Sequence, residues 1–469
     1  MSDFLKNHKF SILLLLAGIA FYWSFAYDLD RSDFIKLISL YTGLFFISFK
    51  IIQLEKTNFW FLAGIAILFR LIFIIATPNL SQDFYRFIWD GTLILEGLNP
   101  YLSVPKELPT SLQPISQELI QGMGSLSAGN YTSYPPVNQL LFAISALLGG
   151  KSILGSLVVM RLLIILADLG ILYFGRKLLL KLDLPVHQIF WFILNPFIII
   201  ELTGNLHFEG VMLFFLVWSV YLLHQKKWIR SAVLLGISVS VKLLPLLFLP
   251  LLWKYFLKKR SFKNLPDNAL IKNKIKQVQE LNFQQLFTYY LIAGFTILIS
   301  FLPFISSEFI TNFSASIVLW FQKFEFNASI YYVIRWIGFQ LKGYNIIETA
   351  GKILPLIVMI ILAALAFFRK NNTTERLLST MLLGVSAYFL LATTVHPWYV
   401  ATPLLLSVFT NFRFALIWSF LVILSYSAYS NAEFKENFWL IAIEYILVIG
   451  IFLLEIFRPR LLSRFPYYK

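Results

Sequence analysis

Long apolar runs dominate the chain, and clusters of polar residues separate them. The runs recur from one end of the sequence to the other, and each has about 17 to 20 residues, enough for a helix to cross the hydrocarbon core of a bilayer. A soluble globular domain would not repeat runs of this length. The pattern therefore predicts an all-α polytopic membrane protein with about 12 to 14 transmembrane helices.

The polar clusters alternate in charge along the chain. Lys and Arg number 39 against 24 Asp and Glu, which gives a net charge of +15. The basic residues are mostly confined to alternate loops, which is the positive-inside arrangement of a membrane protein and not a nucleic-acid-binding patch. The N-terminus, with Lys6 and Lys9, and the basic segment 258–276 are therefore expected in the cytoplasm. That segment is expected to lie near anionic membrane lipids, and no nucleic-acid partner is expected.

Two long polar regions fall on the opposite side: a first large external loop at 77–152 and a second at 305–352. In the first, the apolar stretch Val137–Leu148 would form only about 18 Å of helix, too short for a crossing, so it is expected to lie at the outer surface. In the second, Phe309–Phe324 and Ser329–Phe339 are predicted to be amphipathic helices on the membrane surface.

Composition agrees with a single membrane domain over residues 1–469. Hydrophobic residues make up 58% of the chain, charged residues 13%, and the mean hydropathy is +0.74. The absence of cysteine excludes disulfides, thiolate metal sites and cysteine nucleophiles. Charges inside apolar runs need partners. Arg161 and Asp168 are expected to form a structural polar stripe, and Arg70 either pairs with another helix or points into a polar cavity.

The candidate chemistry is concentrated in Ser81–Tyr101, which follows the third apolar run, expected at Phe59–Ala76. In a helix, residues seven apart share a face, so Asp83 and Asp90 lie on one stripe with Arg86 between them. The same spacing is common on solvated helix faces held by weak pairs. The position at a membrane surface, beside several aromatic residues, favours a functional site. The helix is expected to be broken by Gly91, Gly97, Asn99 and Pro100.

The motif in this stretch is D-x-Y-R-x-x-W-D-G, five residues, then G-x-N-P-Y, starting at Asp83. It resembles the first extracytoplasmic loop of polyprenol-phosphate-sugar-dependent glycosyltransferases of the GT-C superfamily, and is most similar to bacterial mannosyltransferase-like members. Further pieces support the resemblance: Tyr134-Pro135-Pro136, Asn205–Gly210, Lys242 before a Pro-rich segment, and His396–Tyr399. The resemblance implies a GT-C-like fold in a bacterial inner membrane, with the active site on the periplasmic side.

The implied reaction moves a hexose, with mannose favoured, from a polyprenyl phosphate to an extracytoplasmic glycan or lipid acceptor. Such transfer needs a carboxylate to take the acceptor proton and cations to hold the phosphate. The resemblance makes Asp83 the general base, with Asp90 as the second acid. Arg86 and Lys242 are the candidates for the lipid phosphate, although Lys242 also fits a snorkelling lysine at a helix end.

The remaining candidates concern the sugar and the acceptor. His207 and Glu209 either line the acceptor side or cap a helix at the interface. His396, Trp398 and Tyr399 either stack on a sugar ring or belong to an aromatic belt. No cofactor is required by the pattern, because Lys or Arg can hold a single phosphate. A divalent cation, Mg²⁺ or Mn²⁺, stays open, and its ligands are not assigned.

Two alternatives remain. A transporter or flippase of lipid-linked sugars would place its polar groups near the membrane midplane, on broken helices in repeated halves. A polymerase or ligase of lipid-linked envelope glycans would be expected to use arginines in large external loops. The candidate residues here fall at outer helix ends and loops, which favours the transferase.

Overall fold

The computed structural model describes residues 2–108, 115–150, 152–257, 281–431 and 433–458. Throughout these ranges the regular elements are helices, and the only β pairing is an isolated parallel bridge between Phe326 and Thr394. The predicted all-α class is therefore confirmed. The basic segment 258–276 lies outside the described residues.

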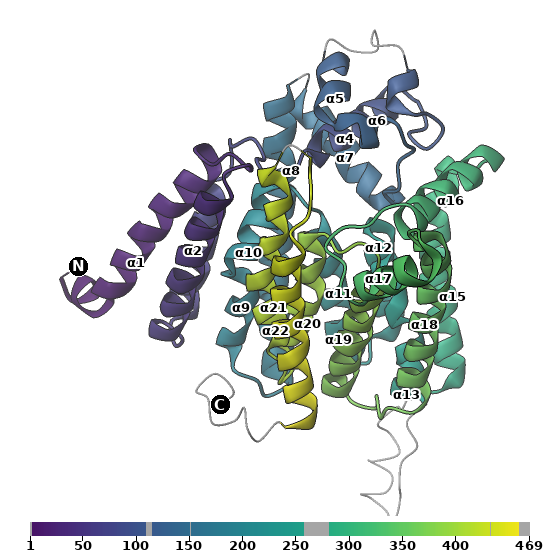
Figure 1. Cartoon of the computed structure of the whole chain (residues 1–469). Coiled ribbons are helices and arrows are strands. Elements are labelled where there is room, and N and C mark those ends of the chain that lie inside the picture. The colour runs from purple at the N-terminus through teal and green to yellow at the C-terminus, as the bar shows by residue number, and fades with distance from the viewer. Residues whose placement is uncertain (1, 109–114, 151, 258–280, 432, 459–469) are drawn as a thin grey trace, which may run out of the picture.

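Membrane-spanning potential is spread along the whole described chain (Figure 1). Six helices are long and apolar enough to cross a membrane: α1 (Ser2–Tyr27), α2 (Phe34–Leu54), α8 (Ile153–Lys181), α15 (Phe283–Phe301), α18 (Ile347–Phe367) and α22 (Phe438–Phe457). A seventh span is formed if Val186–Ile193 and Pro196–Gly204, which meet at a 48° bend, are counted as one. These helices confirm a polytopic membrane protein.

Shorter apolar helices of 10–17 residues accompany these spans, most of them in the bundle. They are α3 (Phe59–Leu71), α7 (Pro136–Gly149), α11 (Glu209–His224), α12 (Trp228–Val241), the segment Leu244–Phe256, and the segments Pro397–Val408 and Phe414–Ser430. The predicted 12 to 14 crossings therefore require most of these shorter helices to cross as well. The third apolar run was expected to continue as helix to Ala76, but α3 ends at Leu71 and irregular chain leads on to residue 83.

The first external region forms a helical cap at one end of the bundle (Figure 1). The cap consists of α4 (Asp83–Leu95), α5 (Ser116–Gly122), α6 (Gly124–Ala128) and α7. Gly91 was expected to break the first of these helices, but α4 continues through it to Leu95. A Cβ at Gly91 would overlap the carbonyl oxygen of Phe142, so this glycine lets α4 and α7 pack closely. Phe87 and Phe142 stack beside it with centroids 4.4 Å apart.

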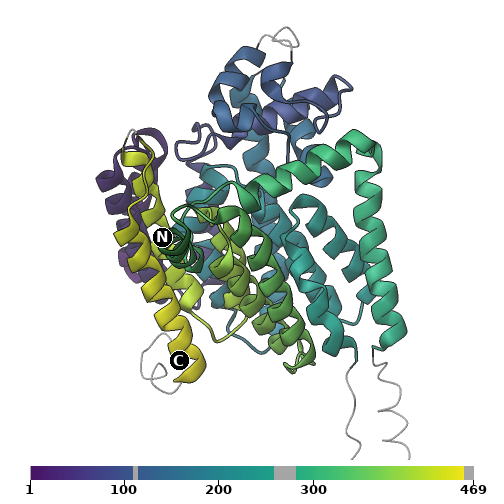
Figure 2. The same ribbon diagram turned by 45° about the vertical axis from the view of Figure 1, so that its right-hand side comes forward.

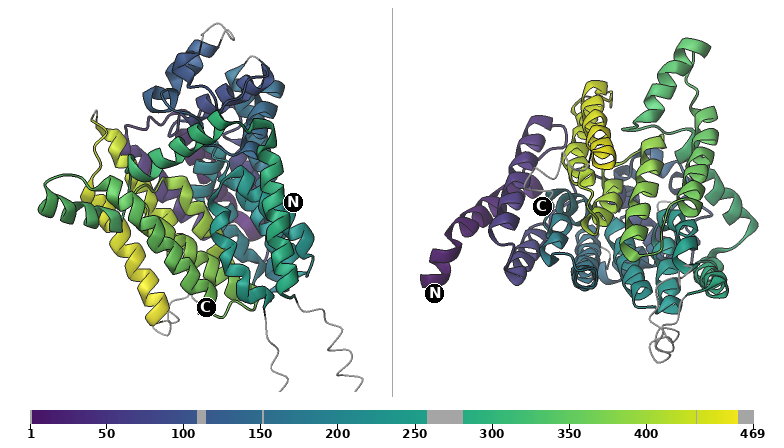
Figure 3. Two further views of the ribbon diagram at one scale, coloured as in Figure 1. Left: turned by 90° about the vertical axis from the view of Figure 1, so that its right-hand side faces the viewer. Right: turned by 90° about the horizontal axis from the view of Figure 1, so that it is seen from below.

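The second external region lies against the cap, as Figure 2 shows for α16 (Ser307–Gln322). Asn312 Nδ2 donates to the carbonyl of Tyr101 at 3.0 Å, and Ser316 Oγ donates to that of Tyr131, also at 3.0 Å. α17 (Ile330–Lys342) follows, so both predicted surface helices form. In the right-hand view of Figure 3, α1 and α2 lie at the side of the bundle.

The two buried arginines of the bundle, Arg70 and Arg161, both have ion-pair or hydrogen-bond partners. Arg70 pairs with another helix, because its Nε lies 2.7 Å from Asp168 Oδ2 on α8. Arg161 does not share that pair. It donates instead to the carbonyls of Thr203 and Gly204, at 3.2 and 3.1 Å. The two charges of the predicted stripe thus serve different parts of the fold, and Arg161 fixes the end of the bent span near the candidate site.

Candidate active site

Three predicted residues meet where the cap joins the bundle. Asp83 begins α4, Glu209 begins α11, and Lys242 directly follows α12. Lys242 Nζ lies 2.8 Å from Glu209 Oε1 and 5.1 Å from the centre of the Tyr134 ring. Lys242 is held in an extended conformation, with φ −147° and ψ 139°, and Pro245 after it cannot supply an N–H to continue α12. The helix end therefore presents the ammonium group to the cap.

The surroundings of Asp83 shift its pKa. Burial raises the pKa of Asp83 from 3.8 to about 6, with Lys242 lowering it and Glu209 raising it further. A carboxylate with this pKa is ionised at neutral pH and still basic enough to accept a proton. The cluster thus places a carboxylate that can accept a proton, Asp83, together with a cation, Lys242, where the cap joins the bundle.

The segment leading into α11 is irregular. It contains a π-helical turn, Ile199–Gly204, and Leu206 adopts the left-handed φ of 64°. Such turns and such backbone angles are concentrated at functional sites. Glu201 lies in the turn, fully buried, and its Oε1 accepts a hydrogen bond from Tyr426 at 2.9 Å. His207 Nε2 is 3.8 Å from Glu201 Oε2.

His207, Trp398 and His396 form a stack of rings. The Trp398 ring lies 3.6 Å from that of His207 and 4.6 Å from that of His396, centre to centre. Burial, with Lys242 adding to it, lowers the pKa of His396 to about 3 and that of His207 well below 6.5. Both imidazoles are therefore neutral at neutral pH. Trp398 is thus already engaged by two rings, and Tyr399 packs against Phe389 with centres 5.6 Å apart.

The second external region supports this stack from the other side. Phe326 donates to the carbonyl of Thr393 at 3.2 Å and accepts from Val395 at 2.8 Å, which forms the isolated bridge. The Phe326 ring then lies 5.5 Å from that of His396. His396 is consequently positioned by both the bundle and the second loop.

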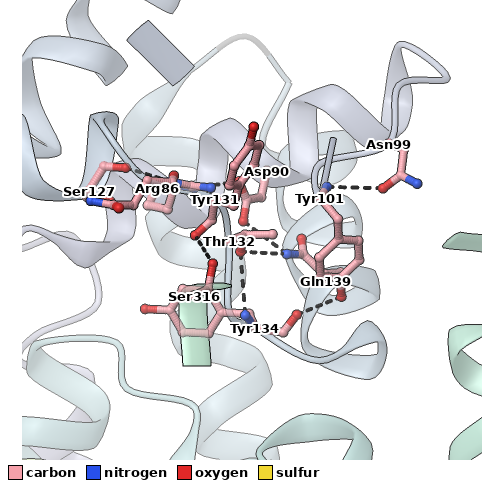
Figure 4. Close-up of polar contacts among 11 residues, drawn as sticks. Arg86, Asp90, Asn99, Tyr101, Ser127, Tyr131, Thr132, Tyr134, Gln139 and Ser316 are labelled. Carbon is pink, nitrogen blue, oxygen red and sulfur yellow. Dashed lines mark hydrogen bonds and ion pairs between the residues drawn. The ribbon is translucent and has the colours of Figure 1, made fainter. Parts of the chain in front are cut away.

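Arg86 and Asp90 are engaged with each other and with the cap (Figure 4). Arg86 Nε lies 2.7 Å from Asp90 Oδ1, and Arg86 Nη1 donates to the carbonyls of Ser127 and Asn130 at 2.7 and 2.9 Å. Gln139 Nε2 donates to Asp90 Oδ2 at 3.0 Å. Both members of the pair are buried. Their hydrogen bonds hold α4 to the rest of the cap.

The spacing explains why Asp90 is not beside Asp83. Seven residues of helix bring two side chains onto one face, but they also separate them by about 10 Å along the axis. Tyr134 contacts both regions: its ring lies 5.1 Å from Lys242 Nζ of the cluster and 5.1 Å from the ring of Phe87 on α4. The predicted phosphate-binding role of Arg86 and the second-acid role of Asp90 stay predictions, and the structure places both residues in the cap network.

Sequence reasoning missed Glu201 and Tyr426 as neighbours of the site. Glu201 falls inside an apolar run, where an ionisable residue is itself a signal of function. Tyr426 comes from the C-terminal part of the chain, and nothing local marks it. For a metal, no group of three or more His, Cys, Asp or Glu in the described ranges could hold an ion. The divalent cation stays a prediction.

Residues 32–257 match the model of a family described as "Alpha-(1->6)-mannopyranosyltransferase, N-terminal domain". The predicted resemblance to mannosyltransferases is confirmed. The matched range contains Asp83, Glu201, His207, Glu209 and Lys242, and it ends before the His396–Tyr399 segment.

Two curated relatives agree with the family match. Alpha-(1->6)-mannopyranosyltransferase A of Mycobacterium tuberculosis is 22% identical over 191 residues, which are 40% of this chain and 36% of the relative. Alpha-(1->6)-mannopyranosyltransferase B of Corynebacterium glutamicum is 25% identical over 143 residues, 30% of this chain and 23% of the relative. The chain thus spans about a third or less of each relative's length. Both relatives are glycosyltransferases, the predicted enzyme class.

Proposed function

We propose that this protein is a membrane glycosyltransferase that moves a mannosyl residue from a polyprenyl phosphate to a hydroxyl group of a glycan or lipid acceptor. It would act on the periplasmic side of a bacterial inner membrane. The observation that carries the proposal is the cluster at the junction of cap and bundle, in which Asp83, with a pKa of about 6, lies with Lys242 and Glu209. The similarity to mannopyranosyltransferases supports the sugar.

The reaction uses the two charges of the cluster in different ways. The acceptor hydroxyl gives its proton to Asp83 while its oxygen bonds to the anomeric carbon of the sugar. The bond from that carbon to the phosphate oxygen breaks, and polyprenyl phosphate leaves with the electron pair. General-base assistance of this kind accelerates a reaction by about 10² to 10⁴.

Lys242 is suited to the leaving phosphate. Its ammonium has three N–H donors, and Glu209 Oε1 occupies one direction at 2.8 Å. The side chain keeps 21% of its surface exposed, so a phosphate oxygen can approach it. Negative charge grows on that phosphate as the bond breaks, and a fixed cation stabilises it.

The isoprenoid tail needs an apolar surface next to this site. A shallow hollow of about 20 Å³ between α18 and α19 (Thr374–Leu391) is lined mainly by apolar side chains, among them Leu354, Pro355 and Leu391. It reaches Thr393, close in sequence to the His396 stack. The isoprenoid tail is proposed to lie along this apolar surface.

The direct test replaces Asp83 by Asn in the full chain, in membranes supplied with polyprenyl-phosphate mannose. Transfer to acceptor should fall by about 10² or more, because the amide cannot take the proton. Asp28→Asn, at an exposed acid paired with Lys36, is the matched control and should keep normal transfer. Full activity in Asp83→Asn would overturn the base assignment. A wild-type protein that moves the lipid across the membrane but forms no glycosidic bond would identify a flippase instead.

A further inference from the structure

The segment 201–209 holds an unusual series of buried polar atoms. At every second residue, a side-chain atom lacks a hydrogen-bond partner among the described residues: Glu201 Oε2, Thr203 Oγ1, Asn205 Nδ2, His207 Nε2 and Glu209 Oε2. All five side chains are at least nine-tenths buried. Folded proteins leave few such atoms unpaired, because each gives up its contacts with water without a replacement. A series of five in one segment points to a polar group that binds there.

Two of these atoms face each other, and the Asn205 amide also lies beside the Glu201 carboxyl group. Glu201 Oε2 and His207 Nε2 are 3.8 Å apart, which is too long for a direct hydrogen bond. An oxygen placed between them can lie about 2.8 Å from each. A hydroxyl group both donates and accepts, so it can hydrogen-bond to a carboxyl group and to a neutral imidazole at the same time. An apolar group placed there would leave both atoms unpaired.

Both side chains are held in place by contacts that do not involve the facing atoms. Tyr426 fixes the other carboxylate oxygen of Glu201, at 2.9 Å. Trp398 stacks on the His207 ring with centres 3.6 Å apart. The π-helical turn and the left-handed Leu206 set the course of the backbone between the two residues, which are six positions apart. A pair held in this way is preorganised for a ligand.

We propose that Glu201 and His207 form a subsite that binds one hydroxyl group of a hexose during transfer. The inference rests on the proposed function, since Glu209 links the same segment to Lys242 and the reacting cluster. The hydroxyl belongs either to the donor mannose or to the acceptor sugar. In both cases the subsite makes the enzyme select a hexose that carries a hydroxyl at one given position.

The experiment crosses substrates with variants of the full-length membrane protein. The substrates are polyprenyl-phosphate mannose and, as acceptor, octyl mannoside, each also as analogues in which one hydroxyl at a time is replaced by hydrogen. The variant is Glu201→Gln. Tyr426→Phe is the matched control, because it removes the other hydrogen bond of the same carboxylate and leaves Oε2 unchanged. His207→Asn tests the opposite side of the pair, including the case in which Glu201→Gln does not fold.

In the wild type and in Tyr426→Phe, one analogue should lose at least about tenfold in kcat/KM. In Glu201→Gln and His207→Asn, the kcat/KM of the same analogue should be nearly equal to that of the parent sugar. A donor analogue that behaves in this way assigns the donor hexose, and an acceptor analogue assigns the acceptor. Equal losses for every analogue in wild type and variants would overturn the subsite and leave a bound water as the partner of the pair. Absence of transfer by the wild type would instead refute the proposed function.

Discussion

The ionisation of Asp83 gives the sharpest test of the proposed chemistry. A base must be deprotonated to act, and the pKa of Asp83 is raised from 3.8 to about 6. Activity should therefore be present above this value and be lost as the pH falls through it. At pH 5 about one tenth of Asp83 is ionised, so kcat/KM should drop about tenfold from its plateau. An ordinary carboxyl group would still be more than about nine-tenths ionised at that pH.

The fall of activity on the acidic side of the pH profile is called the acid limb below. Two substitutions should shift it in opposite directions. Glu209 raises the pKa of Asp83, so Glu209→Gln should shift the limb to lower pH. Lys242 lowers the same pKa, so Lys242→Gln should shift the limb to higher pH. Both variants are also expected to lower the plateau, because Lys242 is assigned to the phosphate. The position of the limb and the height of the plateau are separate readouts.

The assay is transfer from polyprenyl-phosphate mannose by protein in detergent, measured as kcat/KM between about pH 4.5 and 8. Samples returned from the lowest pH to neutral pH should recover their activity. Asp83 itself does not promote acid unfolding. Its folded-state pKa is above its unfolded value, so its contribution to stability is lost as the pH rises through about 6 and is fully present below 3.8. A limb at the ordinary carboxyl range, or one that neither substitution moves, would refute the reasoning.

Two further predictions concern the cap. Asp90→Asn should lower the free energy of unfolding by about 3–5 kcal/mol, because Arg86 would remain buried and charged without its counterion; an unchanged unfolding midpoint in detergent would contradict this. Gly91→Ala should destabilise the protein by about 1–3 kcal/mol, because its Cβ would overlap the Phe142 carbonyl. Gly64→Ala is the control for thermal unfolding, since a Cβ there meets no atom within 4 Å, and equal effects of the two changes would refute the packing argument.

The residues of the reacting cluster were accessible to sequence reasoning for a simple reason. Asp83, Glu209 and Lys242 each stand at an end of an apolar stretch, and ends of spans on one side of a membrane form one surface. The same reasoning does not find Glu201, because Glu201 lies inside an apolar run and reaches the site through a π-helical turn. Such a turn has no sequence signature comparable to a proline or a glycine. The position of the Glu201 carboxyl group therefore follows only from the three-dimensional structure.

Helix periodicity accounts for the difference between Asp83 and Asp90. The pattern correctly placed both on one face of α4, but a face extends along the helix, and only the start of α4 reaches Lys242 and Glu209. Hydrophobic patterning likewise predicted the class of the fold better than the number of crossings. Many helices of the bundle are shorter than a full span, as α11 and α12 illustrate. Their boundaries depend on packing and on turns that composition does not mark.

The position of Asp83 depends on two anchors, and they can be separated. One is the cap network around the Arg86–Asp90 pair, on the same helix. The other is local: the backbone N–H of Leu80, just before α4, donates to Asn205 Oδ1 at 3.2 Å, which ties this point to the bundle. If the cap dominates, Asp90→Asn loosens α4 and admits water to Asp83. Because burial is the main cause of the raised pKa, the acid limb of that variant should then move toward 3.8. If the limb stays at about 6 while stability falls, the bundle alone positions the base.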